Sequence, residues 1–279
     1  MLKNITIGQY FPGDSPIHRL DPRIKLVLSV VYITMLFMAG GMLTLGVSVV
    51  CLFLIYGLAK IPFSMILRSL KPIMPIIIFT AVLNIFFVPS EDPIWSWRAL
   101  SISREGIETA IMMCVRILAL IAGTSLLTYT TTPITLTDAI ERLFSPLKKI
   151  KMPVHEITMM MTIALRFIPA LIEETDKIMS AQKARGADME SGTIFQRVKA
   201  LVPILVPLFV SAFRRADELA LAMESRCYHG GDGRTRMRQM KMSIIDLWAV
   251  LFMAVMLAAV ILVNSLPLTI MLGPIGGAL

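Results

Sequence analysis

The stretch 26-LVLSVVYITMLFMAGGMLTLGVSVVCLFLIYGLA-59 contains no charged residue and decides the fold class of this chain. As one helix, these 34 residues would extend about 50 Å at 1.5 Å per residue, well beyond the roughly 30 Å hydrocarbon core of a bilayer. We therefore predict two membrane-spanning helices that fold back on each other at Gly40 and Gly41. A chain with such a segment is an integral membrane protein.

The composition points to further spans. Of the 279 residues, 56% are hydrophobic, and the mean hydropathy of +0.74 argues against a soluble globular domain. Three more apolar runs, at 72–88, 107–129 and 244–264, bring the predicted number of transmembrane helices to five. The segment 91–106 is predicted to be a polar loop, with two tryptophans that suit the membrane interface.

The formal net charge of +8 would suit a nucleic-acid-binding protein, but the positions of the charges argue otherwise. If the N-terminus is cytoplasmic, only Arg98 and Arg104 of the 27 Lys and Arg residues lie in outside loops, and Arg116 lies within a span. The other 24 (27 − 3) lie on the cytoplasmic side, which is the asymmetry expected of a membrane protein. We predict a cytoplasmic N-terminus, an outside C-terminus and no nucleic-acid partner.

Most of the charge falls in the long segment between the fourth and fifth spans. This segment predicts a short amphipathic helix at 133–145, followed by two long helices at 154–185 and 193–227. The predicted domains are a membrane domain with spans one to four, a cytoplasmic coupling-helix domain, and a last transmembrane helix with its tail, at 1–131, 132–242 and 243–279.

Each long helix has an apolar N-terminal half and a charged C-terminal half. Pro169 should bend the first helix, and Pro203 and Pro207 should bend the second. The run Met159-Met160-Met161 suits core filling and, equally, a surface that repacks against different partners. Apolar residues of the first helix recur at i, i+3 and i+4 and predict one buried face, formed by Ile157, Met160, Met161, Ala164, Leu165, Ile168, Leu171 and Ile172.

No catalytic or metal-binding motif is present in the sequence. GGDGRTR (230–236) lacks the lysine and hydroxyl pair of a nucleotide-binding loop, and HEITM (155–159) has methionine where a zinc protease has its second histidine. We expect no metal, no cofactor and no catalysis by this chain. The intramembrane Arg116 is open to two interpretations: a structural arginine paired within the bundle, or a contact to a second membrane subunit.

Two similar arginine motifs end the two long helices. AQKARGAD (181–188) and LAMESRCYHG (221–230) share the pattern Ala-x-x-[Ala/Ser]-Arg-[Gly/Cys]. One arginine at a helix end is usually a cation favoured by the helix dipole, and two could also hold their own domain together. Small residues at i−4 and i−1 would instead let each helix end enter a groove, where the guanidinium could bind a carboxylate. Two such ends favour two similar soluble partners.

The stretches that contain these motifs carry a resemblance to a known family. ALRFIPALIEETDKIMSAQKARGAD (164–188) and LVPLFVSAFRRADELALAMESRCYHGG (205–231), together with DPRIKL (21–26) and the apolar spans, resemble the transmembrane coupling (T) component of energy-coupling factor vitamin transporters. The resemblance covers nearly the whole chain. It implies an all-α polytopic membrane protein with about five transmembrane helices and a cytoplasmic domain of long crossed coupling helices.

The resemblance also implies partners. In that family the T component lies in the prokaryotic plasma membrane and joins two cytoplasmic ATP-binding-cassette (ABC) ATPase subunits to a small membrane subunit that captures the substrate. Its two coupling helices end in arginine motifs that dock in grooves on the ATPases. The chain would then couple ATP binding and hydrolysis to movement of the capturing subunit, for uptake of a vitamin or other micronutrient. A membrane scaffold, or a membrane-embedded enzyme unconnected to ATP-driven transport, is the alternative.

Carried over to this chain, the family's arginine motif places specific residues at the two ATPases. The ATPase-docking residues would be Ala184, Arg185 and Gly186 on one helix and Ser225, Arg226 and Cys227 on the other. The second triplet departs from the usual Ala-Arg-Gly on both sides of its arginine. The expected contacts to the substrate-capturing subunit are Met159, Met160, Met161, Arg116, Pro203 and Pro207.

Overall fold

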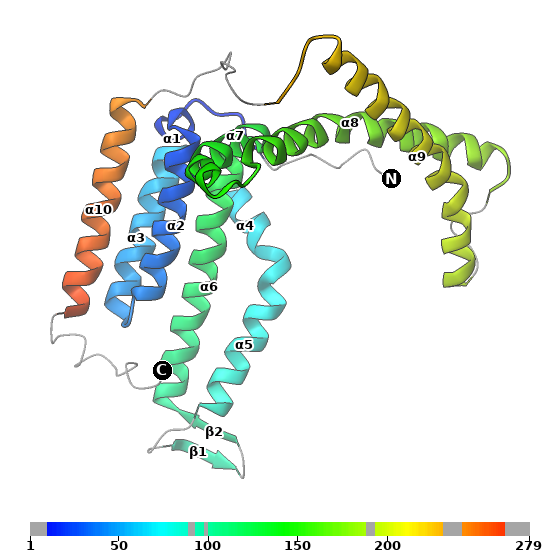
Figure 1. Ribbon diagram of the computed structural model, residues 1–279. Helices are drawn as coiled ribbons and strands as arrows, with labels where there is room; N and C mark the ends of the chain where they lie inside the picture. The colour runs from blue at the N-terminus through cyan, green and yellow to red at the C-terminus, as the bar shows by residue number, and fades with distance from the viewer. Residues whose placement is uncertain (1–9, 89–92, 98–99, 188–192, 231–241, 266–279) are drawn as a thin grey trace. The chain divides into compact units, whose positions relative to one another are not determined.

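The computed structural model describes residues 10–88, 93–97, 100–187, 193–230 and 242–265, and it is built almost wholly of helices (Figure 1). Arg98 and the tail 266–279 lie outside the described residues. The elements are α1 (Pro16–Arg19), α2 (Pro22–Met38), α3 (Met42–Ala59), α4 (Phe63–Leu70), η1 (Lys71–Ile73), α5 (Met74–Phe87), β1 (Pro93–Trp97), β2 (Leu100–Ser103), α6 (Arg104–Thr130), α7 (Pro133–Phe144), η2 (Ser145–Ile150), α8 (Val154–Ala184), α9 (Ile194–Glu224) and α10 (Ile244–Ser265). The predicted all-α class is confirmed.

The chain folds as two compact units. The bundle unit comprises 8–139 and 239–279, and its described helices are α1 to α6 and α10, with most of α7. The crossed-helix unit contains 140–238, with α8 and α9 as its long helices. The domain boundaries predicted from the sequence remain a prediction.

Within the described residues, five helical segments are long and apolar enough to cross a bilayer, the predicted number, but they are not the five segments that were predicted. They are α3, the α4–α5 segment, α6, α8 and α10. The predicted break at Gly40 and Gly41 is confirmed, because α2 ends at Met38 and α3 begins at Met42. However, α2 has only 17 residues, about 25 Å of helix, which is at the lower limit for a span. The chain is a multi-pass membrane protein.

The predicted polar loop after α5 contains a β-hairpin. β1 and β2 pair antiparallel, with Trp97 opposite Leu100 and Trp95 opposite Ile102. LSIS and the last three residues of PIWSW alternate apolar and polar residues, which is the two-residue period of a strand. The loop interpretation was wrong because the segment's overall polarity outweighed this short alternation.

The core of the bundle unit lies where α2, α3, α6 and α10 pack together. Met35, Leu36 and Cys51 are fully buried there. Gly123 of α6 allows the close approach of α2, since a Cβ at that position would lie only 2.4 Å from a ring carbon of Tyr32. Tyr56 donates a hydrogen bond to the carbonyl oxygen of Ala122 at 2.7 Å, so its buried hydroxyl is satisfied.

The DPRIKL stretch forms a buried polar junction at one end of this bundle. The Asp21 side chain accepts a hydrogen bond from the Arg23 backbone at the start of α2 and pairs with the Arg23 guanidinium at 2.6 Å. The Lys25 ammonium donates to the carbonyl oxygens of His18 at 3.1 Å and Thr130 at 2.8 Å. Asp246 accepts from the Asp21 backbone N–H at 2.8 Å. The junction therefore ties the starts of α2 and α10 to the end of α6.

Candidate functional site

The two helices that carry the arginine motifs have the same length. α8 and α9 are each 31 residues long, and both contain proline: Pro169 in α8, and Pro203 and Pro207 in α9. In both helices the N-terminal half is mainly apolar and the C-terminal half is charged, so the common layout predicted from the sequence falls on two helices of equal length.

The C-terminus of α8 is a Schellman cap. The Gly186 N–H donates to the Lys183 carbonyl oxygen, and the Ala187 N–H donates to the Gln182 carbonyl oxygen, both at 3.0 Å. Gly186 has a φ of +85°, the left-handed conformation that this cap requires and that glycine adopts without steric cost. Arg185 is the last residue before this left-handed position.

The C-terminus of α9 repeats this cap. The Cys227 N–H donates to the Glu224 carbonyl oxygen at 2.8 Å, and the Tyr228 N–H donates to that of Met223 at 3.0 Å. Cys227 takes the place of glycine, with a φ of +55°. Arg226 therefore occupies the same position in its cap as Arg185 does in the first. The departure from Ala-Arg-Gly changes the residue type and leaves the cap geometry intact.

Both arginines are free to bind a partner. Arg185 and Arg226 are exposed, as are the neighbours Ala184, Gly186 and Ser225. Cys227 is exposed as well. Within the described residues, neither guanidinium makes a hydrogen bond or an ion pair. An unpaired guanidinium keeps its full fork of donors for a carboxylate.

α8 and α9 cross each other (Figure 1). An ion pair between Glu174 and Arg215 links the two helices. The Gln182 side chain also donates to the Pro203 carbonyl oxygen at 3.2 Å, so the helices cross in antiparallel directions. Both side chains of the ion pair are largely buried, with exposed fractions of 21% for Glu174 and 33% for Arg215. Water screens such a pair less than it would one on an open surface.

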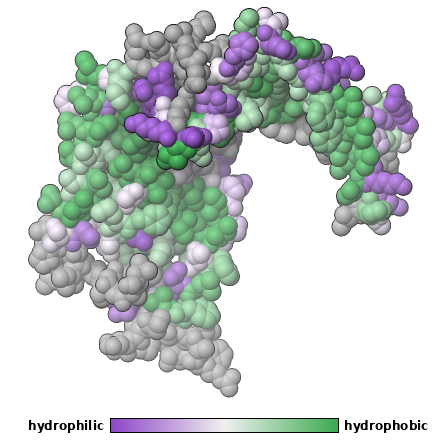
Figure 2. All heavy atoms as spheres, in the orientation of Figure 1, coloured by the Kyte–Doolittle hydropathy of each residue, from purple (hydrophilic) through white to green (hydrophobic). Residues whose placement is uncertain are grey.

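The apolar halves of these helices are not buried within the chain. Of the face predicted to be buried in α8, Ile157, Met160 and Met161 are 41%, 60% and 42% exposed. The prediction of one buried face was therefore wrong for these residues, and Leu165, Ile168, Leu171 and Ile172 of the same face are only half-buried. Met159 is half-buried, and Pro203 and Pro207 are exposed. The exposed apolar side chains of α9 form much of its hydrophobic surface (Figure 2) and include Leu201, Val202, Leu205, Val206, Phe209, Val210 and Phe213.

Arg116 makes a bond inside the bundle unit. Its guanidinium donates to the carbonyl oxygen of Ala39 at 2.6 Å, at the C-terminal end of α2. A cation at this place satisfies one of the free carbonyls of the helix end and suits the dipole. Its Nε is buried and has no partner among the described residues. This geometry favours the structural interpretation, and the expected contact to a second subunit remains a prediction.

Comparison with known proteins supplies the family. Residues 13–237 match the model of the cobalt transport protein family CbiQ, which is most of the chain. The chain belongs to this family.

Curated relatives of this CbiQ-family chain carry one name, energy-coupling factor transporter transmembrane protein EcfT. The protein of Clostridium kluyveri is 54% identical over 263 residues, which cover 94% of this chain and 97% of the relative. That of Ruminiclostridium cellulolyticum is 52% identical, covering 88% and 92%, and that of Bacillus subtilis is 48% identical, covering 86% and 91%. The resemblance noted in the sequence is confirmed.

Sequence reasoning on this CbiQ-family chain missed the residues that hold its helices together. Glu174 and Arg215 are two charges among many in their helix halves, and nothing local marks them as partners. Alignment of the two arginine motifs could have found them, since each lies eleven residues before its own arginine (185 − 174 and 226 − 215). Asp246 had a clearer signal, as an isolated acid at the start of an apolar run.

Proposed function

We propose that this chain is the transmembrane coupling subunit of an energy-coupling factor importer. It links ATP binding and hydrolysis by two cytoplasmic ABC ATPase subunits to movement of a substrate-capturing membrane subunit. The observation that carries the proposal is the pair of equivalent caps that present Arg185 and Arg226, both exposed and without a described partner. The name shared by the relatives gives independent support.

Each cap is proposed to dock in a groove on one ATPase. The small side chains beside each arginine, Ala184 and Gly186 in one cap and Ser225 and Cys227 in the other, leave room for a groove wall close to the helix end. The guanidinium then binds a carboxylate within the groove, a charge-assisted contact of about 1.5 to 3 kcal/mol. Two equivalent caps match two similar ATPases.

The apolar halves of α8 and α9 are proposed to contact the substrate-capturing subunit. The exposed Met160 and Met161 offer a flexible surface that can follow a moving partner, and Pro203 and Pro207 lie on the other helix of the pair. The proposed substrate is a vitamin or other micronutrient, and the capturing subunit selects it. The proposed location is the plasma membrane of a prokaryote, with a cytoplasmic N-terminus and an outside C-terminus.

Copurification tests the proposal. The tagged chain should recover two ABC ATPases and a small hydrophobic subunit from membranes. The double variant Arg185→Ala and Arg226→Ala should lose the ATPases and vitamin uptake while still inserting into the membrane. A matched control is Arg166→Ala with Arg214→Ala, because these arginines are exposed on the same helices away from the caps. Normal uptake by the cap variant, or loss of ATPases in the control alone, would refute the docking role.

A non-transport scaffold makes the opposite prediction. It would be recovered without ATPase subunits, whatever residues stand at 185 and 226. A membrane-embedded enzyme would need polar side chains that converge on Arg116, and in the described structure its guanidinium bonds a backbone carbonyl. The coupling function is therefore the one that the residues support best.

A further inference from the structure

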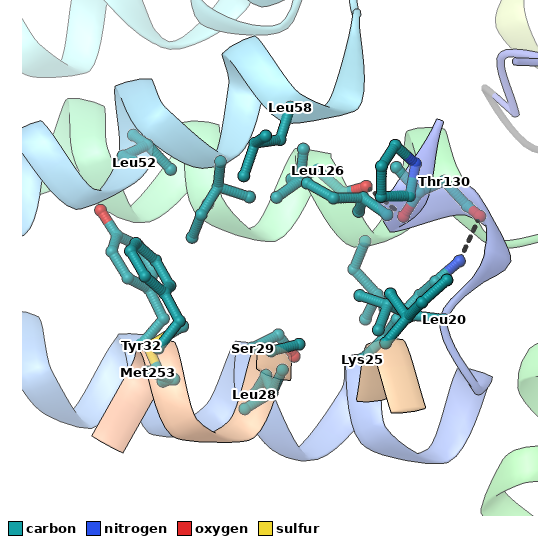
Figure 3. Close-up of a pocket in the computed structure, with 18 of the residues that line it drawn as sticks. Leu20, Lys25, Leu28, Ser29, Tyr32, Leu52, Leu58, Leu126, Thr130 and Met253 are labelled. Carbon is teal, nitrogen blue, oxygen red and sulfur yellow. Dashed lines mark hydrogen bonds between the residues drawn. The ribbon is translucent and has the colours of Figure 1, made fainter. Parts of the chain in front are cut away.

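The bundle unit contains a cavity of about 370 Å³ that the proposed function does not use (Figure 3). Among the described elements, α1, α2, α3, α6 and α10 line it. On α2 these residues are Lys25, Leu28, Ser29 and Tyr32, at the i, i+3, i+4 and i+7 positions of a single helix face. Leu52, Ile55 and Leu58 of α3, Leu126 of α6, and Trp248 and Phe252 of α10 add to the apolar wall.

The cavity has a polar end and an apolar end. Lys25 and Thr130 lie at one end and Tyr32 and Leu52 at the other, so it runs along α2 (Figure 3). Seven residues of α2 separate Lys25 from Tyr32, which is about 10 Å along a helix. The cavity is thus elongated, with a cation at one end and hydrocarbon along its length.

The wall offers almost nothing to a polar solute. The hydroxyls of Ser29 and Thr130 donate to carbonyl oxygens of their own helices, of Leu26 at 2.8 Å and Leu126 at 2.9 Å. A polar molecule, or water, inside would leave its own hydrogen-bonding groups unpaired. An empty cavity of this size would forfeit the packing contacts of its wall. The wall chemistry therefore calls for an apolar occupant.

Lys25 adds a cationic hydrogen-bond donor at one end of the cavity. Its residue is only 7% exposed, and two of its three N–H donors bond the backbone carbonyls of His18 and Thr130. The third has no acceptor among the described residues. The nearby carboxylates are already engaged, since Asp21 pairs with Arg23 and Asp246 accepts two backbone N–H groups. One donor of a buried cation is thus left for an acceptor from outside.

The cavity is reachable from the surroundings of the helices. Leu58 and Trp248 line it and are also 54% and 66% exposed. They belong to α3 and α10, which are long and apolar enough to span a bilayer, so the molecules next to them are lipids.

We propose that this cavity binds one acyl chain of a bilayer phospholipid, with a phosphate or ester oxygen of that lipid at the Lys25 ammonium. A phospholipid combines a long apolar chain with an anionic headgroup, and it is the main constituent of the bilayer around the opening. The lipid would fill the gap between α2, α3, α6 and α10 and so act as a structural part of the bundle unit. The site is separate from the arginine caps.

Photocrosslinking tests this site. The full chain with its copurifying partners is placed in phosphatidylglycerol nanodiscs that contain a tracer of phosphatidylglycerol with a diazirine on one acyl chain. Mass spectrometry should find adducts on inward residues such as Leu28 and Leu126. Ala249→Phe, which fills the cavity from α10, should remove most of these adducts. Ala254→Phe adds the same ring at an exposed α10 position outside the cavity and should leave them unchanged.

Two results would overturn the proposal. One is a complete absence of lipid adducts on Leu28 and Leu126 while lipid-exposed positions such as Val255 are labelled. The other is equal labelling of the cavity wall in the Ala249→Phe and Ala254→Phe proteins. If Ala249→Phe does not fold, Ser29→Leu fills the cavity from α2 and is judged by the same two results. Cap variants that lose the ATPases should keep these lipid adducts. The lipid-site proposal and the coupling function can therefore be refuted independently of each other.

Discussion

Glu174 of α8 and Arg215 of α9 form an ion pair between equivalent positions of the two helices, since each residue precedes the arginine of its own cap by eleven positions. Eleven residues of helix correspond to about 16 Å. The Glu174–Arg215 contact therefore lies at the same distance along each helix from the arginine of its cap. A rotation of one helix about this contact moves its arginine through the same arc as the equivalent rotation of the other.

We expect removal of this ion pair to weaken the crossing. Glu174→Gln leaves the Arg215 guanidinium without its carboxylate and should loosen the α8–α9 contact, with lower uptake per ATP hydrolysed. The charge exchange Glu174→Arg with Arg215→Glu should restore part of the loss, with a coupling energy of about 1 kcal/mol in a double-mutant cycle. Unfolding of the purified chain and uptake by reconstituted complexes measure the two effects.

The neighbouring residues provide a control for the exchange. Glu173 and Arg214 are one position earlier in their helices, are exposed, and make no described ion pair with each other. Exchange of their charges should change neither stability nor coupling. If both exchanges have the same effect, the Glu174–Arg215 pair has no special role.

The caps predict opposite effects for two substitutions. Gly186→Ala places a Cβ on a residue with φ of +85°, where no atom obstructs it, so the expected loss of about 1 kcal/mol comes from the backbone conformation alone. Cys227→Gly removes the same strain at φ of +55° and should stabilise its cap. Hydrogen exchange of the cap amides measures both effects. Gly57→Ala, which is helical and equally unobstructed, is the control and should not destabilise.

Because α2 and α6 are in close contact at Gly123, adding one methyl group there should lower the stability of the bundle strongly. Gly123→Ala would put its Cβ 2.4 Å from the Tyr32 ring and should destabilise the bundle by about 1 to 3 kcal/mol, because the ring or the two helices would have to shift. Thermal unfolding in detergent measures the change. Gly46→Ala meets no atom within 4 Å and should be tolerated. Equal stability of both variants would contradict the packing described.

Substitution of Asp246 should destabilise the bundle unit, because this buried side chain accepts two hydrogen bonds. Its two carboxylate oxygens accept the backbone N–H groups of Asp21 at 2.8 Å and Ser243 at 2.7 Å, and its residue is 2% exposed. Asp246→Ala leaves the buried Asp21 N–H without an acceptor and removes the cap of α10, for an expected cost of about 1 to 3 kcal/mol. Asp246→Asn keeps one accepting oxygen, so its unfolding temperature should lie between those of the native protein and the Asp246→Ala variant. An Ala variant as stable as the native chain would contradict this role.

The sequence predicted those features that depend on local chemistry. The uncharged run broken at Gly40 and Gly41 gave the helical hairpin, and the glycine after Arg185 gave the end of α8. The sequence did not predict ion pairs between residues far apart in the chain, because partners such as Glu174 and Arg215 are determined by how two helices cross. The burial of the α8 face was mispredicted for a related reason: apolar periodicity shows that a face needs cover and does not show whether the same chain supplies it.

The Schellman caps have a consequence for the thermodynamics of assembly. Backbone hydrogen bonds within the chain already fix the helix end beside Arg185 and beside Arg226 before any partner arrives. In the proposed docking, less conformational freedom is then left to lose at either end, so more of the contact energy remains as affinity. A loop carrying the same arginines would bind more weakly, even with identical contacts in the complex.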